Sequence, residues 1–113
     1  MTVINGCDDE TRLILIFNLV ELCGRELLNP MVDREIKRIS AESLLENTQW
    51  IGDIVGAERT ECAVQYANWI CNKFKHDDGD PMSKANTIAE LFRLLHSELY
   101  KFYVEAKNKI DEQ

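Results

Sequence analysis

The apolar positions of this chain recur at helical spacing, and the longest apolar run comes first. Only two positions in residues 13–23 are polar, so apolar side chains point in nearly every direction around a helix. Such a helix has to be enclosed, either by the rest of its chain or by a partner. We expect the other segments to wrap it. We also expect it to begin at a cap formed by Asp8 or Asp9 and to end near Leu28.

Two further helical segments follow the first. Residues 31–55 carry two apolar stripes whose register slips near Ser40, which predicts either one bent helix or two helices with Ser40 as the second cap. Gly56 is the expected stop of this region. A third, amphipathic helix is predicted over residues 57–74, because its apolar positions again fall three and four apart.

The last helix has the most regular pattern and is predicted over residues 84–110, with Ser83 as its cap. The Gly, Pro and Asp of residues 75–82 predict a linker before it, and residues 1–7 are expected to form a short lead-in. The whole pattern predicts a single helical domain over residues 1–113. Its expected fold class is all-α, a four- to five-helix bundle with a long C-terminal helix.

The charge balance restricts the partners of such a domain. Thirteen basic and twenty acidic residues give a formal net charge of −7. Direct binding to nucleic acid requires clustered Lys and Arg, and anionic membrane surfaces attract the same cations, so we expect neither. A basic surface on a protein partner would be attracted instead. Solubility alone also accounts for such a charge.

The four cysteines indicate a reducing compartment. No two of them form a CxxC pair and no secretory leader pattern is present, so we expect free thiols and a cytoplasmic protein without a bound metal or cofactor. Cys23, Cys62 and Cys71 are expected to fill the core, because their neighbours are apolar.

Two acidic clusters are candidates for metal binding. The turn at residues 77–80, beside His76, holds three Asp, but its spacing does not match an EF-hand and a solvated turn also explains it. Glu58 and Glu61 share one helix face. They could bind a metal as in all-α nucleotide pyrophosphohydrolases, or simply favour a helix start. The last helix has no acidic pair of matching spacing, so this enzyme is the alternative hypothesis.

Interface residues are expected mainly on the last helix. Four of the candidates lie beside the apolar stripe at steps of four, three and four residues: His96, Tyr100, Tyr103 and Lys107. Amphipathic side chains in such a position form either a protein interface or the rim of the core. The other three, Trp50, Leu91 and Leu94, add apolar surface that a four-helix monomer does not easily bury. This favours a homodimer or another protein partner. The candidate interface residues are Trp50, Leu91, Leu94, His96, Tyr100, Tyr103 and Lys107.

A small basic cluster lies in the second helical region. It consists of Arg34, Lys37 and Arg38, and two nearby glutamates, Glu35 and Glu42, dilute its charge. We interpret it as a solvated helix face with pairs between neighbouring turns, because a helix that reads DNA would carry more positive charge.

These observations favour a non-enzymatic protein-interaction module. We expect a small acidic antagonist, an immunity-type protein or an adaptor, of the kind that phages and mobile elements encode, bound to a basic surface on a protein partner. Neither His76 nor His96 has a nucleophile at a catalytic spacing, so no catalytic residue is assigned. The alternative is a metal-dependent, carboxylate-ligated nucleotide pyrophosphohydrolase.

Overall fold

Helices make up nearly all of the described chain, which comprises residues 8–75 and 81–112 of a computed structural model. Within these ranges the protein has four α-helices, one short 3-10 helix and no strand. The elements are α1 (Asp9–Leu28), α2 (Arg34–Val55), η1 (Ala57–Thr60), α3 (Glu61–Lys75) and α4 (Pro81–Asp111). The predicted all-α class is therefore confirmed, and α4, with 31 residues, is the longest helix.

Local chemistry fixes two helix ends that the sequence marks clearly. The Asp8 side chain accepts a hydrogen bond of 2.8 Å from the backbone N–H of Thr11, as an N-cap does. After α2, Gly56 takes a φ of +112°, which residues with a Cβ rarely adopt, and its N–H donates to the Gly52 carbonyl at 2.8 Å. Both predicted boundaries are confirmed.

The second helical region is one continuous helix, so the first of the two predicted alternatives, a single helix, is confirmed and the second, a cap at Ser40, is wrong. α2 begins at Arg34 because Asp33 accepts a hydrogen bond of 2.7 Å from the backbone N–H of Glu35. Ser40 is buried inside the helix, and its hydroxyl donates to the Glu26 carboxylate of α1. Since this partner on another helix satisfies the hydroxyl, Ser40 does not compete with the helix backbone.

The third helix also begins later than predicted. Residues 57–60 form η1, and the Thr60 hydroxyl donates to the Ala57 carbonyl at 3.2 Å. Thr60 is buried against Gly52, where an added Cβ would lie only 2.6 Å from the Thr60 hydroxyl oxygen. This close packing at the α2 end holds the first turn in the tighter 3-10 form, and α3 proper starts at Glu61.

The start of α4 differs from the predicted one as well. The helix begins at Pro81, whose missing N–H suits a first helical position, so Ser83 lies inside α4 and is not its cap. Lys75 still belongs to α3, and therefore only residues 76–80 separate the two helices. These five residues, like the predicted lead-in at residues 1–7, lie outside the described residues.

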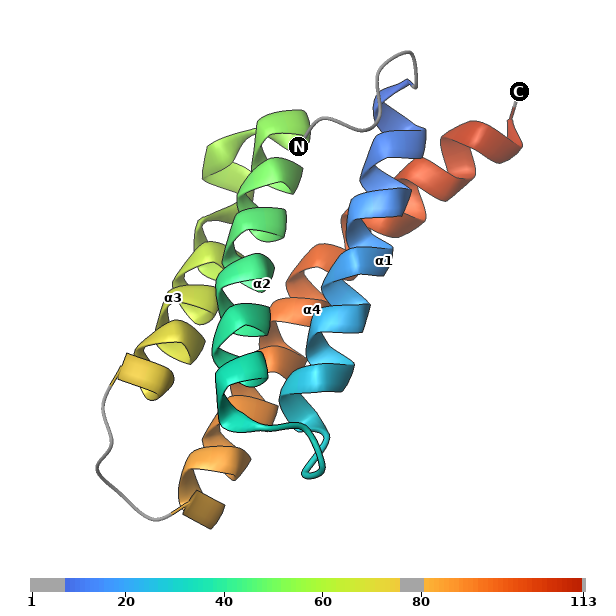
Figure 1. Ribbon diagram of the computed structural model, residues 1–113. Coiled ribbons are helices and arrows are strands. Elements are labelled where there is room, and N and C mark those ends of the chain that lie inside the picture. Colours follow the sequence, from blue (N-terminus) through green and yellow to red (C-terminus); the bar gives the residue numbers. More distant parts are fainter. Residues whose placement is uncertain (1–7, 76–80, 113) are drawn as a thin grey trace.

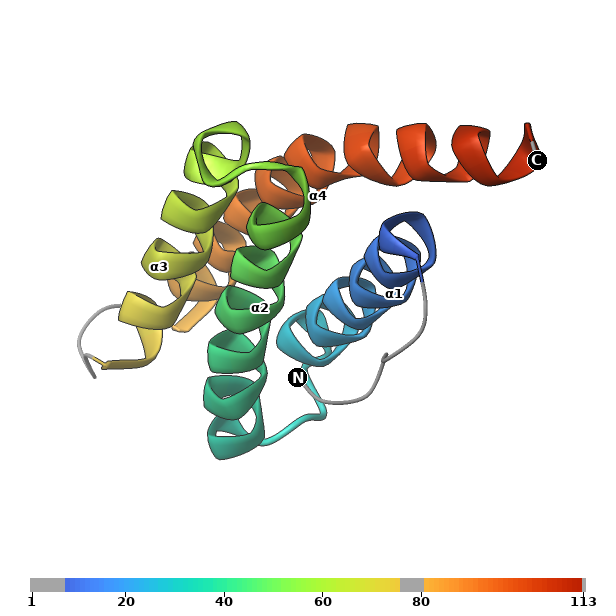
Figure 2. The same ribbon diagram turned by 90° about the horizontal axis from the view of Figure 1, so that it is seen from above.

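Each helix runs antiparallel to the one before it, which brings the first and last helices together (Figure 1). α1 packs against α2 and α4, and α3 packs against the same two helices. Seen from above, the C-terminal end of α4 extends beyond the other helices (Figure 2). The largest fully buried side chains between these helices are Ile16, Phe17, Val20, Leu44, Ile51, Ile70, Leu95, Leu99 and Phe102.

The apolar first helix is enclosed on two sides only. Ile16 and Phe17 are fully buried, whereas Leu15, Leu19 and Leu22 remain 41–49% exposed. The expectation that other segments wrap this helix is therefore wrong for one side, because α2 and α4 are its two principal neighbours. None of the described helices combines the length and the hydropathy that crossing a membrane requires.

Two leucine truncations distinguish the core from this uncovered side. Leu99→Ala removes a fully buried side chain and should lower the free energy of unfolding by about 2–5 kcal/mol. Leu19→Ala removes a half-exposed one and should cost less than about 1 kcal/mol. Urea unfolding followed by circular dichroism measures both. An equal loss in the two variants would mean that Leu19 is buried in the monomer.

Candidate interaction surface

A row of half-exposed leucines runs along α1. Leu15, Leu19 and Leu22 precede Glu26 by eleven, seven and four residues, so all three lie on the side of α1 that also carries Glu26. The Glu26 carboxylate accepts the hydrogen bond from Ser40 of α2. The three leucines therefore border the seam between α1 and α2.

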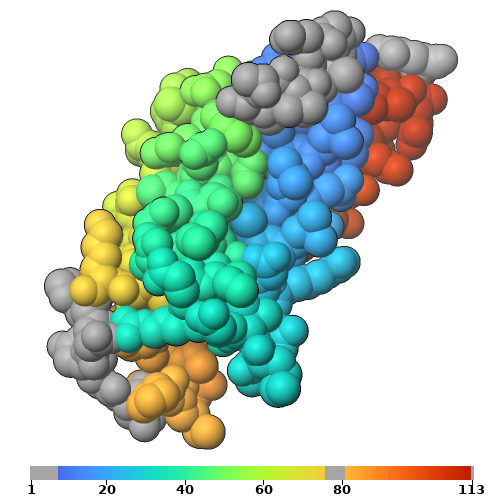
Figure 3. Space-filling model, in the orientation of Figure 1, coloured from blue at the N-terminus to red at the C-terminus, as the bar shows by residue number. Residues whose placement is uncertain are grey.

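α2 adds two apolar side chains to the same seam. Ile36 lies one turn before Ser40, and Ile39 lies three residues after Ile36, so both are neighbours on this side of the helix. They are 47% and 50% exposed, respectively. In the space-filling view α1 and α2 lie side by side on one face of the molecule (Figure 3). We call the following five residues the apolar face: Leu15, Leu19, Leu22, Ile36 and Ile39.

Acidic side chains continue along α2 from the apolar face. Glu46 and Asp53 follow Ile39 at successive steps of seven residues, or two turns, and so lie on the same side of the helix. Both are exposed, and neither forms an ion pair with another described residue. Glu42, which lies between Ile39 and Glu46, is instead held by the Arg38 guanidinium at 2.7 Å. The apolar face thus has an acidic border whose charge is only partly neutralised.

Three of the predicted interface residues form an aromatic cluster with the first helix. The ring of Phe17 lies 5.1 Å from His96, 6.2 Å from Tyr100 and 4.8 Å from Tyr103, measured between centroids. The Nε2 of His96 also lies 3.1 Å from a carboxylate oxygen of Glu21. His96 and Tyr103 are half-buried and Tyr100 is exposed, so the cluster joins α1 to α4 and leaves one ring at the surface.

The seven predicted interface residues do not form one continuous patch. Trp50 lies on α2, which packs mainly on α1 and α3, whereas the other six lie on α4. Trp50 and Leu91 are half-buried and pack against the core. Leu94 is half-buried and Lys107 is exposed. Their role in an interface stays a prediction.

The two described acidic candidates for metal binding lie in adjoining elements. Glu58 lies in η1 and Glu61 opens α3, and both side chains are exposed. Among the described residues no group of three or more His, Cys, Asp or Glu side chains converges in a way that could hold a metal ion. The acidic turn at residues 77–80 and His76 fall outside the described ranges.

Two of the three described cysteines are buried, as predicted, and one is not. Burial raises the pKa of the Cys23 thiol to about 11, and the nearby charge of Glu26 adds to the effect. The Cys71 thiol donates to the Ala41 carbonyl at 3.2 Å, and burial raises its pKa too. The prediction that Cys62 fills the core is wrong, because the buried side of α3 passes through Ala63 and leaves Cys62 exposed.

Comparison with protein-family models, curated proteins and solved structures found no match to this chain. The candidate surface therefore rests on the geometry of the chain itself. Sequence reasoning missed the apolar face because an all-round apolar helix does not indicate which side its neighbours leave uncovered. One indication was present: the polar residue Glu26 lies on the same side of the helix as Leu15 and Leu22, which marks that side as facing solvent.

The three described thiols should differ strongly in reactivity. Because its pKa is about 11, Cys23 has about a hundredth of the thiolate that an ordinary thiol has at pH 8. Only the thiolate is nucleophilic, so Cys23 should react correspondingly more slowly. Iodoacetamide should therefore label Cys62 first and Cys23 and Cys71 much later, in a Cys7→Ser background, as located by peptide mass spectrometry. Equal labelling of Cys23 and Cys62 would contradict the packing of α1 on α2.

Titration with Mg²⁺ and Mn²⁺ tests the carboxylate enzyme. We expect no saturable heat, because Glu58 and Glu61 are exposed and no third carboxylate among the described residues converges on them. Isothermal calorimetry on the protein and on the matched variant Glu58→Gln/Glu61→Gln measures this. Micromolar binding that disappears in the variant would favour the pyrophosphohydrolase instead.

Proposed function

We propose that the chain is a four-helix bundle that works as a non-enzymatic protein-interaction module and binds its partner through the apolar face. The observation that carries this proposal is the row of half-exposed Leu and Ile side chains at the α1–α2 seam, bordered by acidic residues. Contiguous exposed apolar side chains with a polar rim are typical of protein interaction sites, whereas single exposed ones are not. Burying them against a partner removes apolar area from water and so stabilises the complex.

The acidic border defines the chemistry of the partner. Glu46 and Asp53 are exposed and unpaired among the described residues, and the whole chain carries a net charge of −7. A partner surface with apolar side chains in its centre and Lys or Arg around them complements both features. The attraction between the opposite charges accelerates association and weakens as salt is added.

Part of the predicted surface on α4 is available to a partner as a second contact, on the α4 side of α1 and away from the apolar face. The exposed ring of Tyr100 lies against Phe17 of α1, and Lys107 is exposed on a nearby turn of α4. These two residues are proposed as peripheral contacts. A homodimer is the less favoured arrangement, because two copies that each carry seven negative charges repel one another.

The proposal places the protein among small acidic antagonists, immunity-type proteins and adaptors, including those that phages and mobile elements encode. The three described cysteines form no disulfide and two of them are buried, which supports a reducing compartment such as the cytoplasm. No cofactor is assigned to this function.

Matched variants in a capture experiment test the proposed surface. The tagged protein is used to capture partners from the source lysate, next to a Leu19→Gln/Leu22→Gln variant that removes two apolar contacts and keeps the charge. We expect the variant to lose a partner that the unchanged protein retains, with affinity falling about tenfold or more. Glu46→Gln/Asp53→Asn should weaken the same complex and flatten its dependence on salt.

Two controls make the outcome decisive. Asp111→Asn/Glu112→Gln removes the same two charges, one Asp and one Glu, at the exposed C-terminal end of α4 and should leave capture unchanged. Circular dichroism confirms that each variant is folded. Capture that is equal in all variants, or a complex that strengthens as salt is added, would contradict the proposal.

A further inference from the structure

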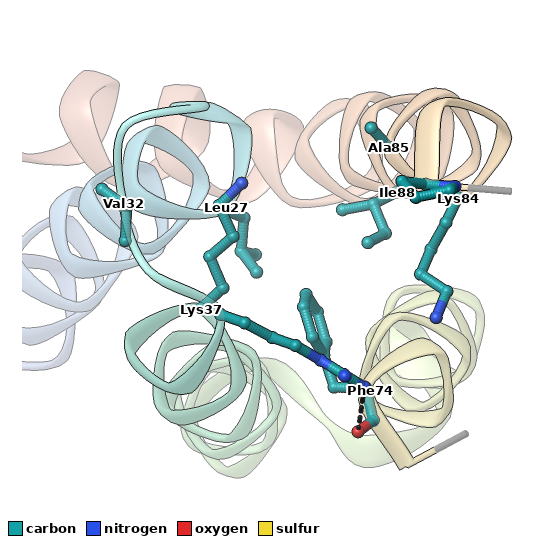
Figure 4. A pocket seen from close by; sticks show the side chains of 9 residues that line it. Leu27, Val32, Lys37, Phe74, Lys84, Ala85 and Ile88 are labelled. Carbon is teal, nitrogen blue, oxygen red and sulfur yellow. Dashed lines mark hydrogen bonds between the residues drawn. The ribbon is translucent and has the colours of Figure 1, made fainter. Parts of the chain in front are cut away.

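A small apolar hollow lies at the end of the molecule where α1 and α3 finish and α2 and α4 begin. It encloses about 310 Å³ and is drawn close up in Figure 4. Its apolar walls come from α1, α3, α4 and the turn between the first two helices: Leu27, Val32, Phe74, Pro81, Ala85 and Ile88. Leu27, Phe74 and Ile88 are buried core residues, so the floor of this basal pocket is part of the core.

Three cationic side chains complete the lining of the basal pocket. Arg34 and Lys37 come from the first turn of α2, and Lys84 comes from α4 on the other side of the opening (Figure 4). The Arg34 guanidinium donates to the Phe74 carbonyl at 3.5 Å, which holds it at the rim. Lys37 is half-buried and forms no ion pair with any described residue.

This concentration of positive charge is opposite to the character of the chain. The protein carries a net charge of −7, yet none of the described residues that line the basal pocket is acidic. A wider hollow beside Trp50 shows the contrast, because Asp53 and Glu61 line it and its charge is negative. The basal pocket is therefore distinguished by its charge as well as by its apolar floor.

We propose that the basal pocket binds a small amphipathic carboxylate, of the class of medium-chain alkanoates. The alkyl chain lies against Leu27, Phe74 and Ile88, where burial of each methylene adds to the affinity. The carboxylate accepts charge-assisted hydrogen bonds at the rim, with Lys37 as its principal donor. A volume of about 310 Å³ is near the lower limit of known ligand pockets, roughly 300–1,000 Å³, which suits a short chain.

A series of probes tests both halves of the ligand. Isothermal calorimetry on the full chain compares octanoate with hexanoate, which shortens the chain, and with octanol, which removes the charge. We expect saturable binding of octanoate at one site. Affinity should fall about threefold to fourfold for each methylene removed and at least fivefold for octanol. No saturable binding, or equal binding of octanoate and octanol, would overturn the proposal.

Two variants locate the binding at the basal pocket. Lys37→Gln removes one rim charge and should weaken octanoate about fivefold or more, whereas Lys101→Gln, an exposed lysine elsewhere on α4, should not. Ala85→Leu adds volume at an exposed helical position in the opening and should abolish binding without unfolding the protein, as circular dichroism checks. Octanoate binding that is unchanged in both pocket variants would overturn the assignment.

One further probe separates a free ligand from a protein end. A short peptide with a free C-terminal leucine presents the same carboxylate and a similar apolar group. If it displaces octanoate with a higher affinity, the small-molecule assignment is overturned and the pocket is a peptide site. The basal pocket shares no residue with the apolar face, so failure here leaves the proposed function unaffected, and the reverse holds too.

Discussion

The contact between α1 and α4 closes the structure. The other major contacts join helices that follow one another in the chain, whereas this one joins the first helix to the last. Three features of different chemistry carry it: the Phe17 ring among aromatic side chains of α4, the Glu21–His96 pair, and the close approach of Phe92 to Gly24. A Cβ at position 24 would overlap the Phe92 ring, so the glycine lets the two helices meet at this point.

That closure also determines what stays exposed. Because α1 packs on α2 with one side and on α4 with another, none of the described helices covers its remaining side, and Leu15, Leu19 and Leu22 stay half-exposed. α2 contributes the acidic border and its own two isoleucines. The opposite distribution appears at the end of the molecule, where Arg34, Lys37 and Lys84 surround an apolar floor. The chain thus has two surfaces of opposite charge, the apolar face with its acidic border and the basal pocket with its cationic rim, which complement different ligands.

The sequence predicts where the helices lie along the chain well, but it predicts poorly which side of each helix its neighbours cover. Periodicity identifies α4 and the buried positions Leu95 and Leu99, and cap chemistry identifies Asp8 and Gly56, because these signals are local. Ser40 left two alternatives open in the sequence, because a serine is a good cap only when its hydroxyl lacks a better partner, and Glu26 on another helix supplies one.

The candidate surface was harder to predict for the same reason. Which side of α1 is free depends on where α2 and α4 lie, and the apolar pattern of α1 gives only one indication of it, the position of its polar residues. Cys62 shows the same limit on a smaller scale, since a shift of one residue separates it from buried Ala63.

The order of the helices has a consequence during synthesis. α4 leaves the ribosome after α1, α2 and α3, so the side of α1 that it covers, which includes Phe17, stays uncovered while the other three helices are already made. Exposed apolar surface of this kind makes partly formed chains prone to aggregation. The nascent chain therefore has two uncovered sides of α1 where the finished protein has one, and a chaperone that binds apolar segments has its best target there.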